Sequence, residues 1–271
     1  MSGLKLTLRQ KPPGRVDLSP LLPERLAGLS PAAIAAIPLP CGNRPFAAGE
    51  LFDIADGDAA DLVIAGGSDR LDHVGSGMTG GRITVEGAVG AYAGLAMTGG
   101  ELRVAGDAGF AAAAMMRGGL VVIEGDAGDF LGGALPGEMR GMRGGLVVVR
   151  GSAGARVGDR MRRGIILVEG DLGDHAAARL LAGTVIGLGS SGIYPGLGMK
   201  RGTLLLARAP ERLLPSFADC GRHELRFLAL VFAHLRPHSR RLVGLAPQLR
   251  ATRRWAGDLA AGGKGEILLA E

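Results

Sequence analysis

The sequence predicts an all-β protein built as a parallel β-helix, and three observations support that fold class. A short segment recurs seven times between Met78 and Ala207, first as MTGGRITVEGAVG, and successive copies start 19, 19, 26, 19, 19 and 19 residues apart. Glycine stands third after the starting residue in every copy, and two positions further along are almost always aliphatic. A constant period near 20 residues is typical of a solenoid in which each repeat forms one coil.

Each recurring position within the repeat predicts one feature of the coil. The first glycine indicates a corner with positive φ or a close backbone approach. The two aliphatic columns are spaced by two residues, which puts both on the inward face of one strand. The glycines are Gly81, Gly100, Gly119, Gly145, Gly164, Gly183 and Gly202. The first aliphatic column is Ile83, Leu102, Val121, Val147, Ile166, Val185 and Leu204.

The coils are expected to wind right-handedly, because crossovers between parallel strands are almost always right-handed. A left-handed hexapeptide helix would need aliphatic residues at every sixth position, whereas one side of each coil is richer here. Aromatic residues make up only 4% of the chain. We therefore expect neither a large aromatic pocket nor a stacking platform for nucleic-acid bases, and we predict no nucleic-acid partner.

The segments outside the array divide the chain into three parts. We expect an N-terminal adaptor and cap over 1–57, the β-helix over 58–207, and a C-terminal helix and tail packed on the solenoid over 208–271. Alternation over Leu4–Leu8 predicts a strand, and Ser30 followed by Pro31 predicts the N-cap and first turn of a short helix. The non-repeating ends would cover the open edges of the sheet.

The C-terminal part contains one predicted helix, Glu224–Leu235, which Pro237 would end. Its apolar residues lie on more than one side. We therefore expect this helix to dock on the solenoid and to touch a second surface, either the C-terminal tail or a partner. A closing apolar run occupies Ile267–Leu269.

Two classes of protein are disfavoured by composition. Cys41 and Cys220 stand far apart without a CxxC motif, so a disulfide framework and a structural zinc site lack support, and both residues are expected to be buried free thiols. No run of about 18 apolar residues and no secretion signal is evident, which predicts a cytoplasmic protein without a membrane partner.

The single interval of 26 residues contains seven extra residues, most easily placed at 132–138. Insertions in a solenoid form loops on one face, often the face that binds. A surface loop without a role is the alternative.

No catalytic or metal-binding set of residues is predicted. His234 and His238 have a spacing that suits two metal ligands on a helix, but Pro237 lies between them and no third ligand is apparent. Asp107, Asp126 and Asp171 occupy equivalent corners. Neighbouring carboxylates could serve acid–base chemistry, but a short acceptor at a glycine corner more simply bonds backbone amides.

The second residue of each repeat is the one candidate binding feature. It reads Thr79, Thr98, Arg117, Arg143, Arg162, Leu181 and Lys200, and stacking would turn it into a column that is basic over the middle coils. Like charges so close repel, so the column is more plausible if an anionic ligand or the acids of a partner face it. A solvated face that aids solubility is the alternative.

The repeat, together with GDFLGGALPGEMRGMRGG around the long interval and GKGEIL near the end, closely resembles the C subunit of the formylmethanofuran dehydrogenase family. Within that family, the chain most resembles the C subunit of the bacterial formyltransferase/hydrolase complex. The repeat is also similar to the C-terminal β-helix of glutamate synthase.

The resemblance implies a non-catalytic scaffold subunit in one-carbon (formaldehyde) metabolism. The bacterial complex is implied to transfer a formyl group from formyl-tetrahydromethanopterin to a methanofuran-type carrier and to hydrolyse it to formate. Its active sites would lie on amidohydrolase-like and formyltransferase-like partners, beside one further subunit. The carrier is implied to bear a polyglutamate tail, which Arg117, Arg143, Arg162 and Arg163 could hold.

Three alternatives to that function stay open at this point. The chain could be the C subunit of a tungsten or molybdenum formylmethanofuran dehydrogenase; the Ala, Arg, Gly and Leu content suggests a GC-rich bacterial genome and favours the hydrolytic complex. It could be an independent β-helix enzyme acting on a polyanion, which would need clustered acids or a metal. It could also be a self-assembling structural solenoid, which would leave its ends uncovered.

Overall fold

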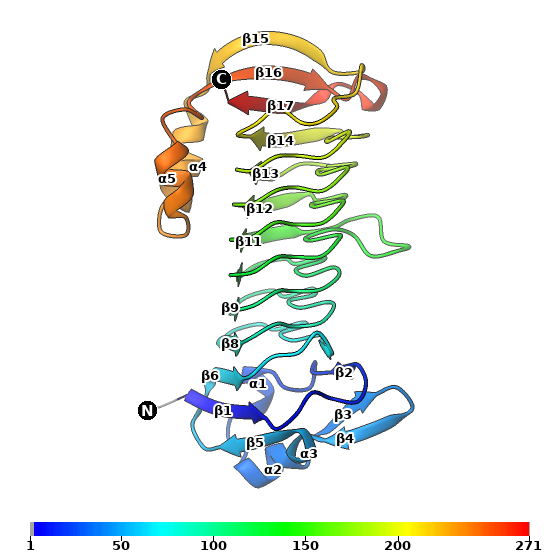
Figure 1. The fold of residues 1–271 in the computed structure, drawn as a ribbon, viewed down its shortest axis with the longest axis vertical. Coiled ribbons are helices and arrows are strands. Elements are labelled where there is room, and N and C mark those ends of the chain that lie inside the picture. The colour runs from blue at the N-terminus through cyan, green and yellow to red at the C-terminus, as the bar shows by residue number, and fades with distance from the viewer. Residues whose placement is uncertain (1–2, 271) are drawn as a thin grey trace.

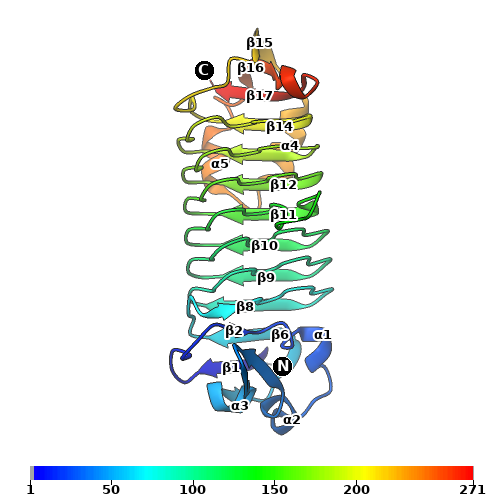
Figure 2. The same cartoon turned by 90° about the vertical axis from the view of Figure 1, so that its right-hand side faces the viewer.

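The chain is described here by a computed structural model that covers residues 3–270. Within that range one 13-stranded sheet runs the length of the molecule, in the order β15-β16-β17-β14-β13-β12-β11-β10-β9-β8-β6-β1-β5. Figures 1 and 2 show a tall stack of coils with the two terminal parts at opposite ends. The predicted parallel β-helix is confirmed, and the sense of its winding stays a prediction from the crossover rule.

The strands of the array stack in register, repeat above repeat. Leu102 pairs with Ile83 on one side and with Val121 on the other, and Val121 pairs with Val147 across the long interval. All seven residues of the first aliphatic column are fully buried. The strands are β6 (Asp58–Ala65), β8 (Arg82–Glu86), β9 (Glu101–Val104), β10 (Leu120–Ile123), β11 (Arg143–Val149), β12 (Arg163–Val168), β13 (Thr184–Gly187) and β14 (Arg201–Leu206).

The glycine that stands third after the start of each repeat has the positive φ that the repeat predicts. At Gly164 φ is +101°, and a Cβ atom there would lie 2.7 Å from the carbonyl oxygen of Gly145 and 2.7 Å from Cε of Met142. The other six glycines of the column also have positive φ, between +76° and +100°. Both the backbone conformation and the close approach of the next coil therefore require glycine.

At the N-terminal end the parallel stack finishes in an antiparallel strand. Strand β1 (Gly3–Leu8) pairs in parallel with β6 and antiparallel with β5 (Phe52–Ala55), which forms the edge of the sheet. Ser30 caps α2 as predicted, its Oγ accepting from the amide of Ala33 at 3.3 Å. The remaining elements are β2 (Val16–Asp17), α1 (Pro23–Leu26), α2 (Pro31–Ala35), β3 (Pro38–Cys41), β4 (Arg44–Ala47), α3 (Ala48–Leu51) and β7 (Leu71–Asp72).

The C-terminal tail adds three strands that the sequence did not indicate. Strand β17 (Lys264–Ala270) pairs in parallel with β14, and β16 (Ala251–Gly257) and β15 (Ala218–Glu224) then follow antiparallel, after a short 3-10 turn at Leu259–Ala261. Parallel stacking thus stops at an antiparallel strand at both ends. Within the described residues, neither end of the sheet therefore offers a parallel coil edge on which a second copy could continue the stack.

A helical hairpin leaves the stack and returns along its outside (Figure 1). It comprises α4 (Phe227–Leu235), which ends before Pro237 as predicted, and α5 (Arg240–Leu245), capped by Ser239. Its inner side packs Leu228, Phe232, Leu235, Leu242 and Leu249 against outward-facing residues of the sheet. None of the helices in residues 3–270 is long and apolar enough to span a membrane.

The extra residues of the long interval form a loop, as predicted, and the coil closes beneath it. The carbonyl oxygen of Gly132 accepts from the amide of Met142 at 2.9 Å, so the chain leaves and rejoins the coil at adjacent points. The loop projects beside β11 in Figure 1, and the side chain of its Met139 is largely exposed.

The two cysteines are free, but they are not buried as their isolation in the sequence suggested. Cys41 is half-buried and Cys220 is exposed. The reason is their position: Cys41 ends β3 beside a turn, and Cys220 lies on β15, the last strand of the sheet. Neither site is part of the solenoid core.

Candidate functional site

The predicted basic column exists as a stacked feature of the coils. The amide of Arg117 donates to the carbonyl oxygen of Met97 at 2.8 Å, that of Arg143 to Met116 at 2.7 Å, and that of Arg162 to Met142 at 2.8 Å. From the second copy onward, the amide of each second residue therefore donates to the carbonyl oxygen of the residue that opens the preceding coil. These bonds fix the three arginine Cα atoms one above another along the solenoid.

The four arginines singled out from the sequence lie on three consecutive coils. Arg143 and Arg163 are partners in the pairing of β11 with β12. The side chains of Arg117, Arg162 and Arg163 are exposed, whereas Arg143 is half-buried and its Nε atom has no hydrogen-bond partner. A buried guanidinium N–H without an acceptor is costly, so an acceptor supplied from outside the chain would stabilise this position.

The column continues into a hollow of about 520 Å³ whose charged lining is entirely basic. Its lining residues are Arg162, Arg163, Gly164, Leu181, Ala182, Gly183, Lys200 and Arg201. Beyond it, Lys264 pairs with Arg201 across β14 and β17 and adds another cation. The sequence pattern did not point to Lys264, although Lys264 and Gly265 match Arg201 and Gly202 of the preceding coil.

No described acid pairs with these cations, whereas several other arginines of the protein form ion pairs. Arg179 forms a bidentate pair with Asp159, which is 1% exposed, at 2.8 and 2.6 Å. Those hydrogen bonds raise the pKa of the Arg179 guanidinium above its ordinary value. Within residues 3–270 no ion pair involves Arg117, Arg143 or any of the four cations of the hollow. The column is therefore a surface suited to an anion.

The aspartates at the glycine corners serve the backbone. The carboxylate of Asp107 accepts from the amide of Asp126 at 2.8 Å, and Asp126 in turn accepts from the amide of Ser152 at 2.7 Å. Asp171 accepts from the amide of Ser190 at 2.6 Å. The bonds run to the next coil rather than within the same turn. The glycine before each of these amides leaves room for the carboxylate, since a Cβ there would overlap it.

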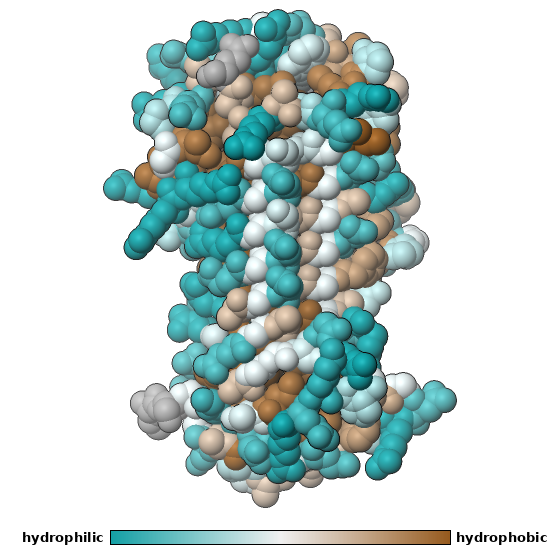
Figure 3. Space-filling model, in the orientation of Figure 1, coloured by the Kyte–Doolittle hydropathy of each residue, from teal (hydrophilic) through white to brown (hydrophobic). Residues whose placement is uncertain are grey.

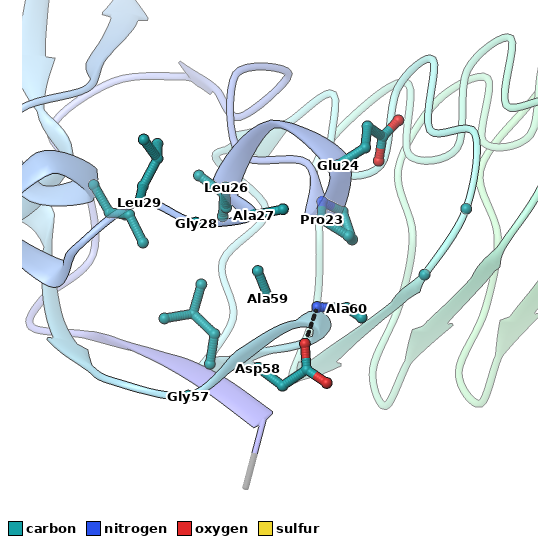
Figure 4. A pocket seen from close by; sticks show the side chains of 14 residues that line it. Pro23, Glu24, Leu26, Ala27, Gly28, Leu29, Gly57, Asp58, Ala59 and Ala60 are labelled. Carbon is teal, nitrogen blue, oxygen red and sulfur yellow. Dashed lines mark hydrogen bonds between the residues drawn. The ribbon is translucent and has the colours of Figure 1, made fainter. Parts of the chain in front are cut away.

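The other candidate chemistry is not assembled in the fold. Among the described residues no group of three or more His, Cys, Asp or Glu side chains could hold a metal ion. A hollow of about 440 Å³ at the N-terminal end, drawn in Figure 4, is lined mainly by apolar residues such as Leu26 and Leu29. Its two carboxylates are already engaged: Asp58 accepts from the amide of Ala60, and Glu24 from the amide of Thr79.

The expectation that the coils offer no stacking platform for nucleic-acid bases stays a prediction, although aromatic side chains of successive coils contact one another. The few aromatic side chains gather at one corner, where His73 stacks on Tyr92 with ring centroids 4.8 Å apart, and Phe110 lies 5.5 Å from Phe130. Arg156 of the next coil lies over the Phe130 ring at 5.7 Å. A low aromatic content does not prevent this, because stacking of the coils brings residues 18 to 26 apart into contact. These aromatic contacts link successive coils.

Equivalent residues stack over the whole length of the solenoid, and the surface shows it. Figure 3 has stripes of like colour running along the long axis, as expected when each position of the repeat forms its own column. The repeat thus converts a single sequence position into a continuous strip of surface. This is how the second position of the repeat becomes a basic strip.

Comparison with known proteins decides the family. The fold matches a chain in the X-ray crystal structure of the formyltransferase/hydrolase complex (FhcABCD) from Methylorubrum extorquens in complex with methylofuran, with a TM-score of 0.90 and 41% identity over 98% of this chain and 99% of that one. In sequence, 85 residues are 43% identical to the C subunit of the Methylorubrum extorquens complex. The chain belongs to the C-subunit family of formylmethanofuran dehydrogenase.

Within this family the hydrolytic branch is the more similar. The C subunit of a tungsten-containing formylmethanofuran dehydrogenase from Methanococcus maripaludis is 31% identical over 94 residues. In sequence, the chain spans about a third of the length of the curated relatives it matches, 32% and 35%. No family model matches the chain.

Proposed function

We propose that this chain is the non-catalytic C subunit of a cytoplasmic formyltransferase/hydrolase complex. The complex would transfer a formyl group from formyl-tetrahydromethanopterin to a methanofuran-type carrier and hydrolyse it to formate. The observation that carries the proposal is the structural match over the whole chain at 41% identity. The lower identity to the tungsten-containing relative favours the hydrolytic complex over the redox one.

In this proposal the solenoid is a rigid scaffold for catalytic partners. The partners are an amidohydrolase-like subunit, a formyltransferase-like subunit and one further subunit. The described part of the chain supports a scaffold role because its corner carboxylates are occupied by backbone amides and its core is filled by aliphatic side chains. Such a core holds surface columns at fixed spacing.

The experiment is to tag this chain in its own cells and to purify what assembles with it. We expect amidohydrolase-like and formyltransferase-like chains to co-purify and the assembly to release formate from formyl-tetrahydromethanopterin. Deleting the chain should abolish assembly. Recovery of the chain without such partners, or an assembly that keeps its activity without this chain, would overturn the proposal.

Within the complex we propose that Arg117, Arg143, Arg162 and Arg163 bind the anionic tail of the carrier. Their side chains lack acidic partners among the described residues, and the Nε atom of Arg143 is buried without an acceptor. Coils repeat about every 4.8 Å, so successive arginines can meet successive carboxylates of an extended polyanion.

Replacing Arg143 and Arg162 with Ala in the purified complex tests this site. The matched control removes two arginines outside the column, R44A with R208A. We expect carrier content, measured by mass spectrometry, to fall in the first variant and to stay unchanged in the control, with assembly intact in both. Unchanged carrier content together with unchanged assembly would show that the column does not bind the carrier. Loss of assembly alone would assign it to a neighbouring subunit instead.

A further inference from the structure

The helical hairpin has one side that covers the sheet and another that nothing in the described chain covers. Leu228, Phe232 and Leu235 face the sheet and are buried. On the other side Leu230 is 76% exposed and Val243 is 44% exposed. In Figure 1 the hairpin stands beside the coils.

The two helices enclose a shallow apolar groove of about 320 Å³. Its lining residues are Ala229, Phe232, Ala233, Arg236, Leu242, Val243, Ala246, Pro247 and Arg250. The only charged groups among them are the two arginines, so the groove combines an apolar floor with a basic rim. Small alanine side chains make up much of the floor, which leaves room for larger side chains from outside.

The whole hairpin is basic. Residues 225–250 contain five arginines and no aspartate or glutamate. Arg226, Arg236, Arg240 and Arg250 form no ion pair with any described residue, and Arg241 makes only a long hydrogen bond, 3.4 Å, to the carbonyl oxygen of Leu188. A segment that is both apolar and purely basic has no complementary charge within its own chain.

Covering the sheet does not require this composition. A helix that covers one surface needs a single apolar stripe, and its opposite side is normally polar. Helix α4 reads FLALVFAHL, in which His234 is the only polar residue. Removing exposed apolar surface from water is favourable, and a second docked element would cover Leu230 and Val243.

We propose that this hairpin docks an acidic amphipathic helix of a partner protein. Its apolar side chains would enter the groove, which Val243 lines, and would cover the exposed Leu230 on the same hairpin. Its carboxylates would pair with Arg236 and Arg250. The groove is concave, which suits inserted side chains better than a lipid surface. Residues 225–250 also contain no Trp, Tyr or Lys, residues that commonly anchor interfacial helices. The inference rests on the hairpin alone and holds whether or not the proposed function does.

The test is site-specific photo-crosslinking in the full-length chain within its own cells. A benzophenone amino acid replaces Leu230, and the matched control places it at Leu259, which is 59% exposed on the C-terminal 3-10 turn. We expect position 230 to capture a peptide whose acidic and apolar residues alternate with helical spacing. The R236E/R250E double variant should reduce that adduct about tenfold or more. Charge reversal of the captured segment should restore it.

Because all of these side chains are exposed, the variants should fold, and an unchanged melting temperature checks this. Three outcomes overturn the proposal: position 230 gives no more adduct than position 259, the adduct is a second copy of this chain, or the captured segment lacks acids and ignores the charge reversal. Binding of the purified chain to phosphatidylglycerol-containing vesicles that L230E abolishes would assign the surface to a membrane and likewise overturn it.

Discussion

The inward and outward faces of the same sheet differ in how they change along the solenoid. The inward column stays aliphatic and buried from Ile83 to Leu204. The outward column, which uses the residue next along each strand, changes after its second member. It begins with Thr84 and Arg103, then becomes apolar. Its apolar members are Val122, Val148, Leu167, Ile186, Leu205 and Leu268.

The helical hairpin covers most of the apolar part of the outward face and leaves the polar part uncovered. Val148, Leu167, Ile186, Leu205 and Leu268 are buried in a cluster with the hairpin leucines. The inward column therefore specifies the coil, and the outward column specifies where another element packs. Two neighbouring positions in the same strand carry these separate roles.

The largest effect is expected from a charge on the inward face. Val147→Asp would place a carboxylate in the aliphatic core and should lower the free energy of unfolding by at least about 4 kcal/mol. Thr84→Asp, on the polar outward face, should change it by about 0.5 kcal/mol or less. Denaturant midpoints followed by circular dichroism compare the two variants. Similar midpoints would mean that the inward and outward faces tolerate a carboxylate equally well.

A smaller and local effect is expected on the covered outward face. Leu167→Ala removes a buried side chain between the sheet and the hairpin and should weaken their contact by about 2–4 kcal/mol. Hydrogen exchange should then quicken in α4 and α5 but not in β8 and β9. Thr84→Ala is the control. Faster exchange throughout the solenoid would show that the hairpin is not an independent layer.

The corner between the faces should respond more weakly still. Gly164→Ala combines φ of +101° with a close approach to the carbonyl oxygen of Gly145, and we expect it to destabilise the chain by about 2 kcal/mol. Gly137→Ala, also at positive φ but with open space around it in the loop of the long interval, is the control for backbone strain alone. Equal losses in melting temperature would mean that contact with the next coil adds nothing.

The smallest effect concerns the pH dependence of the hairpin. Burial, followed by the nearby charges of His234 and Arg103, lowers the pKa of His238 below its ordinary value of 6.5. A histidine whose pKa is lowered on folding is protonated first in the undocked state, so docking should weaken as pH falls through 6.5. Hydrogen exchange in α4, corrected for its intrinsic rate, should rise from pH 7 to 5.5. His238→Gln should flatten this trend, whereas His223→Gln should keep it.

The strands that belong to the repeats could be predicted, because each position recurs and its burial follows from side-chain spacing. The strands of the C-terminal tail could not be predicted. Strand β15 reads ADCGRHE, which has no apolar alternation, and it is a strand only because β16 pairs with it. The aromatic corner was missed because Tyr92 and Phe110 lie 18 residues apart, not 19, and meet only after stacking.

The sequence predicted where the candidate site lies but not how far it extends. The second position of the repeat located Arg117, Arg143 and Arg162, whose stacking follows directly from the period. Lys264 belongs to a strand that returns to the sheet after about 60 residues, so no periodicity pointed to it. The groove of the hairpin depends on α5, a helix of six residues whose sequence alone gives little signal.

The loop of the long interval also shows what lengths this architecture tolerates. The interval of 26 residues is one coil of 19 with seven residues looped out, and the strands on both sides keep their register. Gain or loss of a whole repeat would change the separation of the two ends of the molecule by one layer, about 4.8 Å. The distance between the capped N-terminal end and the hairpin can therefore change only in steps of one coil.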